Sequence, residues 1–241
     1  MLATTLVFNL RRLAHNGRYV GFGAALPIGF YLLYATMYGS GLHVAGTTWG
    51  AYFLISMAGF AAIGTTLNAA GTLTAQDRDR GWTTYLRTTP VGATRYVLGQ
   101  TITAMAASLL VIVLVTLAGI LVEHVAVSAT LLTPMGLVWA GSGAFAAIGL
   151  TLGLWLDTTS ITYGVLVIYL GTSLLGGLWM PLAVLPSAMR QLARFLPSYH
   201  MADMGWQSLA QRAVPWQDVA VLALYAAVFL VLGRLIYARR A

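Results

Sequence analysis

The amino-acid sequence predicts an all-α integral membrane protein with six transmembrane helices. Hydrophobic residues make up 59% of the 241 residues and charged residues only 8%, and the mean hydropathy is +0.80. A soluble globular chain carries about 25% charge, so this chain lacks the charged residues that a water-facing surface needs. The second observation is a series of six apolar stretches, each close to the roughly 20 residues that cross a bilayer as a helix.

The six predicted spans form one transmembrane domain over residues 1–241. They cover approximately residues 19–38, 49–74, 97–122, 131–156, 160–179 and 216–237. No Asp, Glu, Lys or Arg falls near the midplane of any of them. Proton- and ion-coupled carriers usually need such groups inside the membrane, so the pattern argues against a proton-driven antiporter.

Residues 1–18 are predicted to form an amphipathic interfacial helix that lies on the membrane surface. Four leucines follow one another at helical spacing: Leu2, Leu6, Leu10 and Leu13. Asn9, Arg12 and Asn16 lie elsewhere on the helical wheel, an arrangement that is typical of helices at the lipid–water interface. The alternative is a charged tail that only anchors the first span.

The distribution of arginine predicts the orientation of the chain. All 13 basic residues are arginine, and six spans put both termini on one side. With both termini in the cytoplasm, ten arginines lie inside and three lie outside, at positions 190, 194 and 212. The positive-inside rule therefore places both termini and segment 75–93 in the cytoplasm, and segment 180–215 outside. It also explains the basic isoelectric point without a nucleic-acid partner.

The cytoplasmic segment 75–93 concentrates charge. Five charged side chains lie in it: Asp77, Arg78, Asp79, Arg80 and Arg87. Gly81 can end the inner extension of the second span, and Pro90 can end a short helix that follows. On that helix Trp82, Tyr85 and Leu86 share one face, which suits a groove on a partner. An ordinary cytoplasmic loop is the alternative, but it explains neither the two aspartates nor the exposed apolar face.

The extracellular segment 180–215 contains a second amphipathic pattern. An apolar stripe at helical spacing is formed by Leu185, Ala188, Met189, Leu192, Phe195 and Leu196. Pro186 suits the first turn of a helix and Pro197 ends the run. The pattern predicts either an interfacial helix on the outer surface or a re-entrant element after the fifth span.

Several kinds of chemistry are missing from the sequence. There is no cysteine, no lysine and no phosphate-binding G-x-x-x-x-G-K-[ST] motif. The four histidines are scattered, and we predict no metal site. The chain is therefore predicted to bind no cofactor and not to be an enzyme by itself. Energy for any transport would have to come from a partner.

Small residues recur at every fourth position in several spans. Examples are Gly21, Ala25 and Gly29, the pair Gly149 and Gly153, and the pairs Thr172–Gly176 and Ser173–Gly177. Such spacing lets helices approach closely in lipid. It fits packing within the chain as well as a contact between subunits.

Three features together resemble the membrane subunits of type-2 ATP-binding-cassette (ABC) exporters, the drug and polymer export permeases. The first is the plan of an amphipathic N-terminal helix and six spans. The second is "DRDRGWTTYLRTTPV", with Asp77, Arg78, Asp79, Gly81, Thr89 and Pro90 at matching positions. The third is "GGLWMPLAVLPSAMRQLARFLPSYHMADMGWQSL", which is similar to the family's series of Gly-Gly, Pro and Leu-Pro after the fifth span. The chain departs from the family in having Asp for Glu at two positions and no acid near Thr84.

The resemblance implies roles for two segments. Segment 75–93 would be the cytoplasmic coupling helix that docks on an ATPase. The outer segment from Gly176 to Pro197 would be the outer gate or re-entrant region, with the residues Gly176, Gly177, Pro181, Leu185, Pro186 and Pro197.

The resemblance further implies a permease subunit in a bacterial plasma membrane. Two separate ABC ATPase subunits would hold ATP and Mg, and a second permease copy, identical or a sibling, would complete the path through the lipid. The cargo would be hydrophobic or amphiphilic: a drug, natural product or lipid. Two alternatives remain open: an ion-coupled secondary transporter without an ATPase, and a membrane scaffold or immunity protein without a transport cycle.

Overall fold

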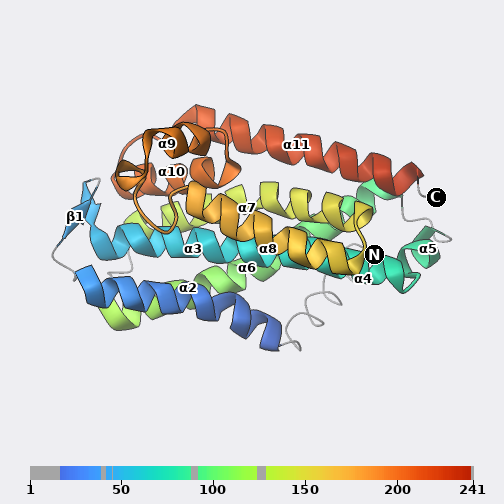
Figure 1. The fold of residues 1–241 in the computed structure, drawn as a ribbon, viewed down its shortest axis with the longest axis horizontal. Coiled ribbons are helices and arrows are strands. Elements are labelled where there is room, and N and C mark those ends of the chain that lie inside the picture. The colour runs from blue at the N-terminus through green and yellow to red at the C-terminus, as the bar shows by residue number, and fades with distance from the viewer. Residues whose placement is uncertain (1–16, 39–41, 45, 88–91, 124–128, 240–241) are drawn as a thin grey trace.

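The computed structural model describes residues 17–38, 42–44, 46–87, 92–123 and 129–239. Long helices run side by side along one axis (Figure 1). They are α2 (Gly17–Tyr38), the continuous helix of α3 (Trp49–Leu67), η1 (Asn68–Thr72) and α4 (Leu73–Asp79), then α6 (Ala93–Glu123), α7 (Ala129–Trp155), α8 (Thr158–Leu175) and α11 (Trp216–Arg239). The interfacial helix predicted within residues 1–18 lies outside the described part, except that residues 17 and 18 begin α2.

The long helices have the dimensions of membrane spans. By length and apolar composition, five segments of the described chain can cross a bilayer: Trp49–Asp79, Ala93–Val122, Thr130–Trp155, Thr158–Leu175 and Trp216–Arg239. They make the chain a multi-pass membrane protein. Helix α2 has 22 residues, about 33 Å at a rise of 1.5 Å per residue, and its role as a sixth span stays a prediction.

Helix α3 forms the centre of the bundle. All 19 of its residues are buried, and it packs against α2, α6, α7, α8 and α10 (Pro197–Leu209). Helices α6, α8 and α11 keep large apolar side chains on their outer faces, such as Leu121, Val167 and Leu224. Outer faces of this kind are expected where lipid or another membrane protein covers them.

A π-helical turn interrupts the central helix between α3 and α4. The turn covers Asn68–Thr72, and the Asn68 side chain donates to the Gly64 carbonyl at 3.0 Å. Here α7 comes so close that a side chain at Gly153 would collide with the backbone carbonyl of Gly71. Gly149 is similarly close to the Leu67 carbonyl. The spacing of Gly149 and Gly153 therefore serves packing within the chain.

The two ends of the bundle differ in the elements that they carry. Helices α4 and α5 (Trp82–Arg87) lie at the same end as the last turn of α11 (Figure 1). A hairpin of β1 (His43–Val44) and β2 (Thr47–Thr48), with α9 (Ser187–Ala193) and α10, lies at the opposite end. Segments 75–93 and 180–215 are thus at opposite ends, as their predicted sides of the membrane require.

The structure corrects the predicted end of the fifth span. Helix α8 ends at Leu175 and not near residue 179, because Gly176 and Gly177 close it with a glycine cap. Gly177 has a φ of 81°, and the Leu178 amide donates to the Ser173 carbonyl at 3.1 Å. A side chain at Gly176 would collide with Ser198, so this glycine also lets α10 approach.

Segment 180–215 contains two separate helices and a short 3₁₀ turn, η2 (Leu182–Val184). Helix α9 contains three of the six residues of the predicted apolar stripe, Ala188, Met189 and Leu192. Leu192 and the following Phe195 are exposed. Pro186 precedes α9, whereas Pro197 begins α10. The single amphipathic pattern thus fails to describe α10, which packs against α7, α11 and α3.

Candidate functional site

The candidate site is the junction between α4 and α5 at one end of the bundle. The sequence folds this way because Gly81 adopts a φ of 76°, a conformation that ends α4 and that side chains disfavour. The Gly81 amide donates to the Arg78 carbonyl at 2.9 Å, and the Gly81 carbonyl accepts from Tyr85 at 3.0 Å. Gly81 therefore both ends α4 and begins α5, as its position predicts.

Helix α5 presents two aromatic rings to the outside. The side chains of Trp82 and Tyr85 are 44% and 59% exposed, and their ring centroids lie 5.4 Å apart in a stacked arrangement. Thr83 is buried on the inner side. Leu86 packs against the buried cluster that contains Tyr96 and Tyr237, so it belongs to the inner face. The exposed face of α5 is thus an aromatic pair rather than the predicted set of three residues.

The charged residues before Gly81 have different surroundings. Asp77 is only 6% exposed and so lies inside the bundle, whereas Arg80 is exposed. The guanidinium of Arg78 donates to Asp79 Oδ1 at 3.0 Å and to the Leu154 carbonyl at 3.1 Å. Arg78 therefore binds carbonyls in the last turn of α7, where the helix dipole favours a cation.

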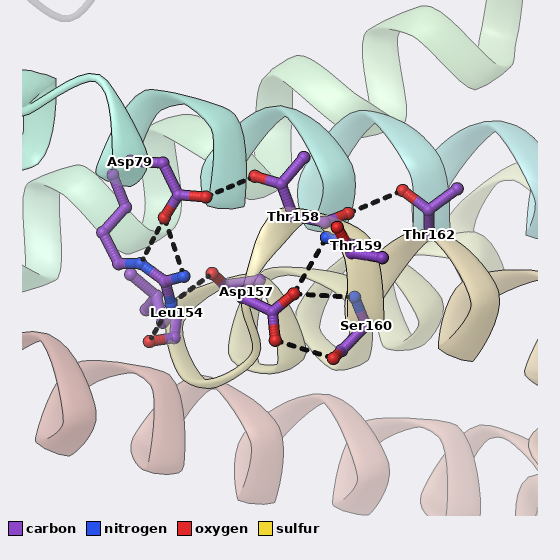
Figure 2. Close-up of polar contacts among 9 residues, drawn as sticks. Asp79, Leu154, Asp157, Thr158, Thr159, Ser160 and Thr162 are labelled. Atoms are coloured by element: carbon purple, nitrogen blue, oxygen red, sulfur yellow. Dashed lines mark hydrogen bonds and ion pairs between the residues drawn. The ribbon is translucent and has the colours of Figure 1, made fainter.

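Asp79 connects α4 to α8 (Figure 2). The Thr158 hydroxyl, in the first turn of α8, donates to Asp79 Oδ2 at 2.5 Å. Together, Arg78, Asp79 and Thr158 form a polar clamp that holds the end of α4 on the turn between α7 and α8. We call these three residues the α4 clamp.

Asp157 caps the helix to which the clamp is attached. Its Oδ1 accepts from the amides of Thr159 and Ser160 at 3.0 and 2.9 Å, and its Oδ2 accepts from the Ser160 hydroxyl at 2.6 Å (Figure 2). The hydrogen bond from Ser160 lowers the pKa of Asp157 below its ordinary value. Asp157 is thus the N-cap residue of α8.

Two predicted docking residues cannot be placed in this site. Pro90 lies outside the described residues, and Arg87 is the last residue of α5, with no description of its side chain. Sequence reasoning missed Thr158 as a partner of Asp79. Nothing in a sequence pairs two residues 79 positions apart, although "DTTS" at 157–160 signals a helix start.

The predicted outer-gate residues occupy a second region, at the opposite end of the bundle. Gly176 and Gly177 end α8, Pro181 precedes η2, and Pro186 and Pro197 stand at the starts of α9 and α10. Leu185 is buried. These residues thus shape the connection from α8 to α10, and gating by them stays a prediction.

The fold and the site define a multi-pass helical membrane protein with an aromatic helix exposed at one end of its bundle. A comparison with protein families matches residues 44–235 to the family described as "ABC-2 family transporter protein". The match covers most of the chain, which therefore belongs to the ABC-2 transporter family. The resemblance inferred from the sequence is confirmed.

A relative of similar length supports this assignment. The chain is 28% identical over 236 residues to the protein named "Putative transport permease YvfS" of Bacillus subtilis (strain 168). The matched region covers 97% of this chain and 95% of the relative. The two proteins therefore match along nearly their whole lengths.

Proposed function

We propose that this chain is the permease subunit of an ATP-driven ABC exporter in a bacterial plasma membrane. The exposed Trp82–Tyr85 pair on α5 carries the proposal, because stacked aromatic rings at a helix surface are frequent anchors of protein interfaces. The partner that we assign to them is an ABC ATPase subunit. Family membership supports this choice over an ion-coupled transporter or a scaffold.

The proposed assembly contains two permease chains and two ATPase subunits. ATP and Mg bind to the ATPases, since the chain has no phosphate-binding loop motif. The second permease copy is identical or a sibling, and the apolar outer faces of α6, α8 and α11 are available to it and to lipid. Both termini lie in the cytoplasm, on the side of α5.

The α4 clamp supplies a route for movement from the ATPase to the spans. Force on α5 passes through Gly81 to the end of α4, and from there through Arg78 to α7 and through Asp79 to α8. ATP binding and hydrolysis then switch the path between inward-facing and outward-facing states. The spans carry apolar, hydroxyl and aromatic side chains, which suits a hydrophobic or amphiphilic cargo.

The experiment that tests the proposal is reconstitution with an ATPase. The tagged chain is expressed with the ATPases of its host, and the complex is purified and placed in vesicles. We expect an ABC ATPase to co-purify and transport of amphiphilic dyes to require ATP hydrolysis. Transport driven by an ion gradient alone, with no ATPase bound, would contradict the proposal.

Replacing Thr158 with valine should weaken coupling without preventing docking. The substitution keeps the shape of the side chain and removes the hydroxyl that donates to Asp79. An exposed hydrogen bond of this kind contributes about 1 kcal/mol, so we expect transport per ATP hydrolysed to fall about fivefold. Thr159→Val is the control, because Thr159 is exposed and makes its helix contact through its backbone amide. Equal coupling in the two variants would remove the clamp from the mechanism.

A further inference from the structure

A pocket at the opposite end of the bundle is not explained by ATPase docking. It has a volume of about 310 Å³ and lies between β1, the start of α3, η2 and α10. Sites for small organic ligands begin at about this volume and combine apolar walls with a few polar groups. The same combination is found here: Tyr52, Tyr199 and Trp206 supply rings, and Asp203 and Arg212 supply charges.

The aromatic walls of the pocket are held in place. The rings of Tyr52 and Trp206 stack at a centroid distance of 4.9 Å with an interplanar angle of 14°. Trp206 Nε1 donates to the Ser56 hydroxyl at 3.0 Å, which fixes the indole against α3. Aromatic rings attract organic cations through their electron-rich faces, by up to about 2 kcal/mol where water is excluded.

A buried histidine–aspartate pair lies next to Asp203. His200 Nδ1 is 2.6 Å from Asp218 Oδ1, and His200 Nε2 is 2.8 Å from the Arg194 carbonyl oxygen. Because a carbonyl can only accept, Nε2 carries a hydrogen. The hydrogen bond between Nδ1 and Oδ1 needs one further hydrogen, which either atom can hold. The His200–Asp218 pair has no net charge in both cases.

Because the His200–Asp218 pair is neutral as a unit, it supplies no net positive charge to Asp203. Asp203 accepts from the Gln207 side chain at 3.1 Å, and the structure forms no ion pair between it and any described basic residue. Burial raises the pKa of Asp203 to about 6, and the negative charge of Asp218 adds to the increase. The groups that act on Asp203 come from three helices: Tyr52 of α3, Tyr199, His200 and Gln207 of α10, and Asp218 of α11. Arg212 lines the same pocket.

We propose that this pocket binds the ammonium group of a small organic cation, with Asp203 as its counter-charge and Tyr52, Tyr199 and Trp206 as its walls. A cation there neutralises the half-buried carboxylate of Asp203, and a proton on Asp203 does so when the site is empty. The buried Oδ2 of Asp218, which has no other donor among the described residues, can accept that proton. Cation and proton therefore compete for the same carboxyl group.

The site stands independently of the proposed export function, and its test uses neither an ATPase nor ATP. The probe is radiolabelled hexyltrimethylammonium, measured by equilibrium binding to the full chain in lipid nanodiscs, with empty nanodiscs subtracted. We expect saturable binding that the uncharged carbon isostere of the probe does not displace. Equal displacement by the isostere would mean that charge plays no part and would overturn the proposal.

Two substitutions on α10 test whether the probe binds in this pocket. Asp203→Asn should weaken probe binding at least tenfold, while Ser208→Ala, on the same helix but outside the pocket lining, should leave it unchanged. In the unmodified chain, affinity should fall about tenfold from pH 7.5 to pH 5, because the ionised fraction of a carboxyl group with a pKa near 6 falls by that factor. Asp203→Asn should abolish this pH dependence. If the dependence persists, the His200–Asp218 pair causes it and Asp203 is not the counter-charge.

A zwitterionic probe separates the proposed ligand from one that needs both charges of the pocket. Phosphocholine presents the same ammonium group together with an anion that Arg212 could bind. We expect it to bind no more tightly than hexyltrimethylammonium, and Arg212→Ala to leave binding of the ammonium probe intact. Tighter binding of phosphocholine that is lost in Arg212→Ala would show that the ligand class is wrong.

Discussion

Replacing Trp82 and Tyr85 together with alanine should abolish binding of the ATPase. The two stacked rings form the exposed face of α5, and a buried aromatic anchor at an interface typically contributes 2 kcal/mol or more. Loss of two such anchors corresponds to an affinity at least about 100-fold weaker. We expect co-purification of the ATPase to disappear and ATP-dependent transport to fall to background.

The folded state should survive this double substitution, because both rings are exposed and neither belongs to a buried cluster. Thermal unfolding of the isolated permease provides the check. Thr84→Ala is the matched control on the same short helix, where an exposed threonine lies beside the aromatic pair. Retention of ATPase binding by the double variant would remove α5 as the docking element, whatever the transport activity.

The second large effect is expected at Gly153. A methyl group there would overlap the carbonyl oxygen of Gly71, which is backbone and cannot rotate away as a side chain could. Overpacking against backbone costs about 3 kcal/mol or more. Gly153→Ala should therefore lower the midpoint of thermal unfolding in detergent by about 10 °C, or prevent recovery of folded protein.

Gly136→Ala supplies the comparison on the same helix. Gly136 is exposed on α7, and nothing lies within 4 Å of where its β-carbon would be. Alanine favours a helix over glycine by up to about 1 kcal/mol, so this variant should unfold at the same temperature or slightly higher. Equal stability of the two variants would mean that the contact between α7 and the π-helical turn is looser than the structure shows.

The long helices could be predicted from hydropathy because their apolar stretches match the thickness of a bilayer. Hydropathy does not show which charged side chains find partners in the folded chain. The second span was predicted to cover residues 49–74 with an inner extension ended by Gly81, and the helix does continue to Asp79. The sequence did not show that Arg78 and Asp79 in this extension find partners in the turn between α7 and α8.

Helix α10 could not be predicted for a related reason. The arginine distribution placed these residues outside, and the predicted amphipathic pattern ended at Pro197, where α10 begins. In the fold, polar residues of α10 pair with groups from other elements. Ser198 donates to the Thr172 carbonyl at 2.6 Å, and His200 contacts Asp218. Polar side chains are compatible with burial once such partners exist, and a sequence does not show the partners.

The aromatic pair of α5 shows what local spacing can and cannot decide. The i, i+3 relation of Trp82 and Tyr85 predicted a shared face, and their rings do stack. The same reasoning placed Leu86 with them, but a six-residue helix has an inner side as well, and Leu86 packs there. The side of α5 that faces inward depends on the direction in which α4 ends. That direction depends on the contacts of Arg78 with α7 and of Asp79 with α8.

The π-helical turn has a consequence for the rotational phase of everything that follows it. A π turn contains one residue more than an α turn, and each residue of an α-helix advances about 100° around the axis. If the same residues formed an uninterrupted α-helix, α4 and α5 would be rotated by about that angle, and Arg78 and Asp79 would turn away from α7 and α8. Removing a single residue from Asn68–Thr72 would instead convert the turn to an α turn and keep the present direction of α4 and α5. The direction in which α5 points is thus specified by this turn, and a single-residue deletion within it tests this where substitutions do not.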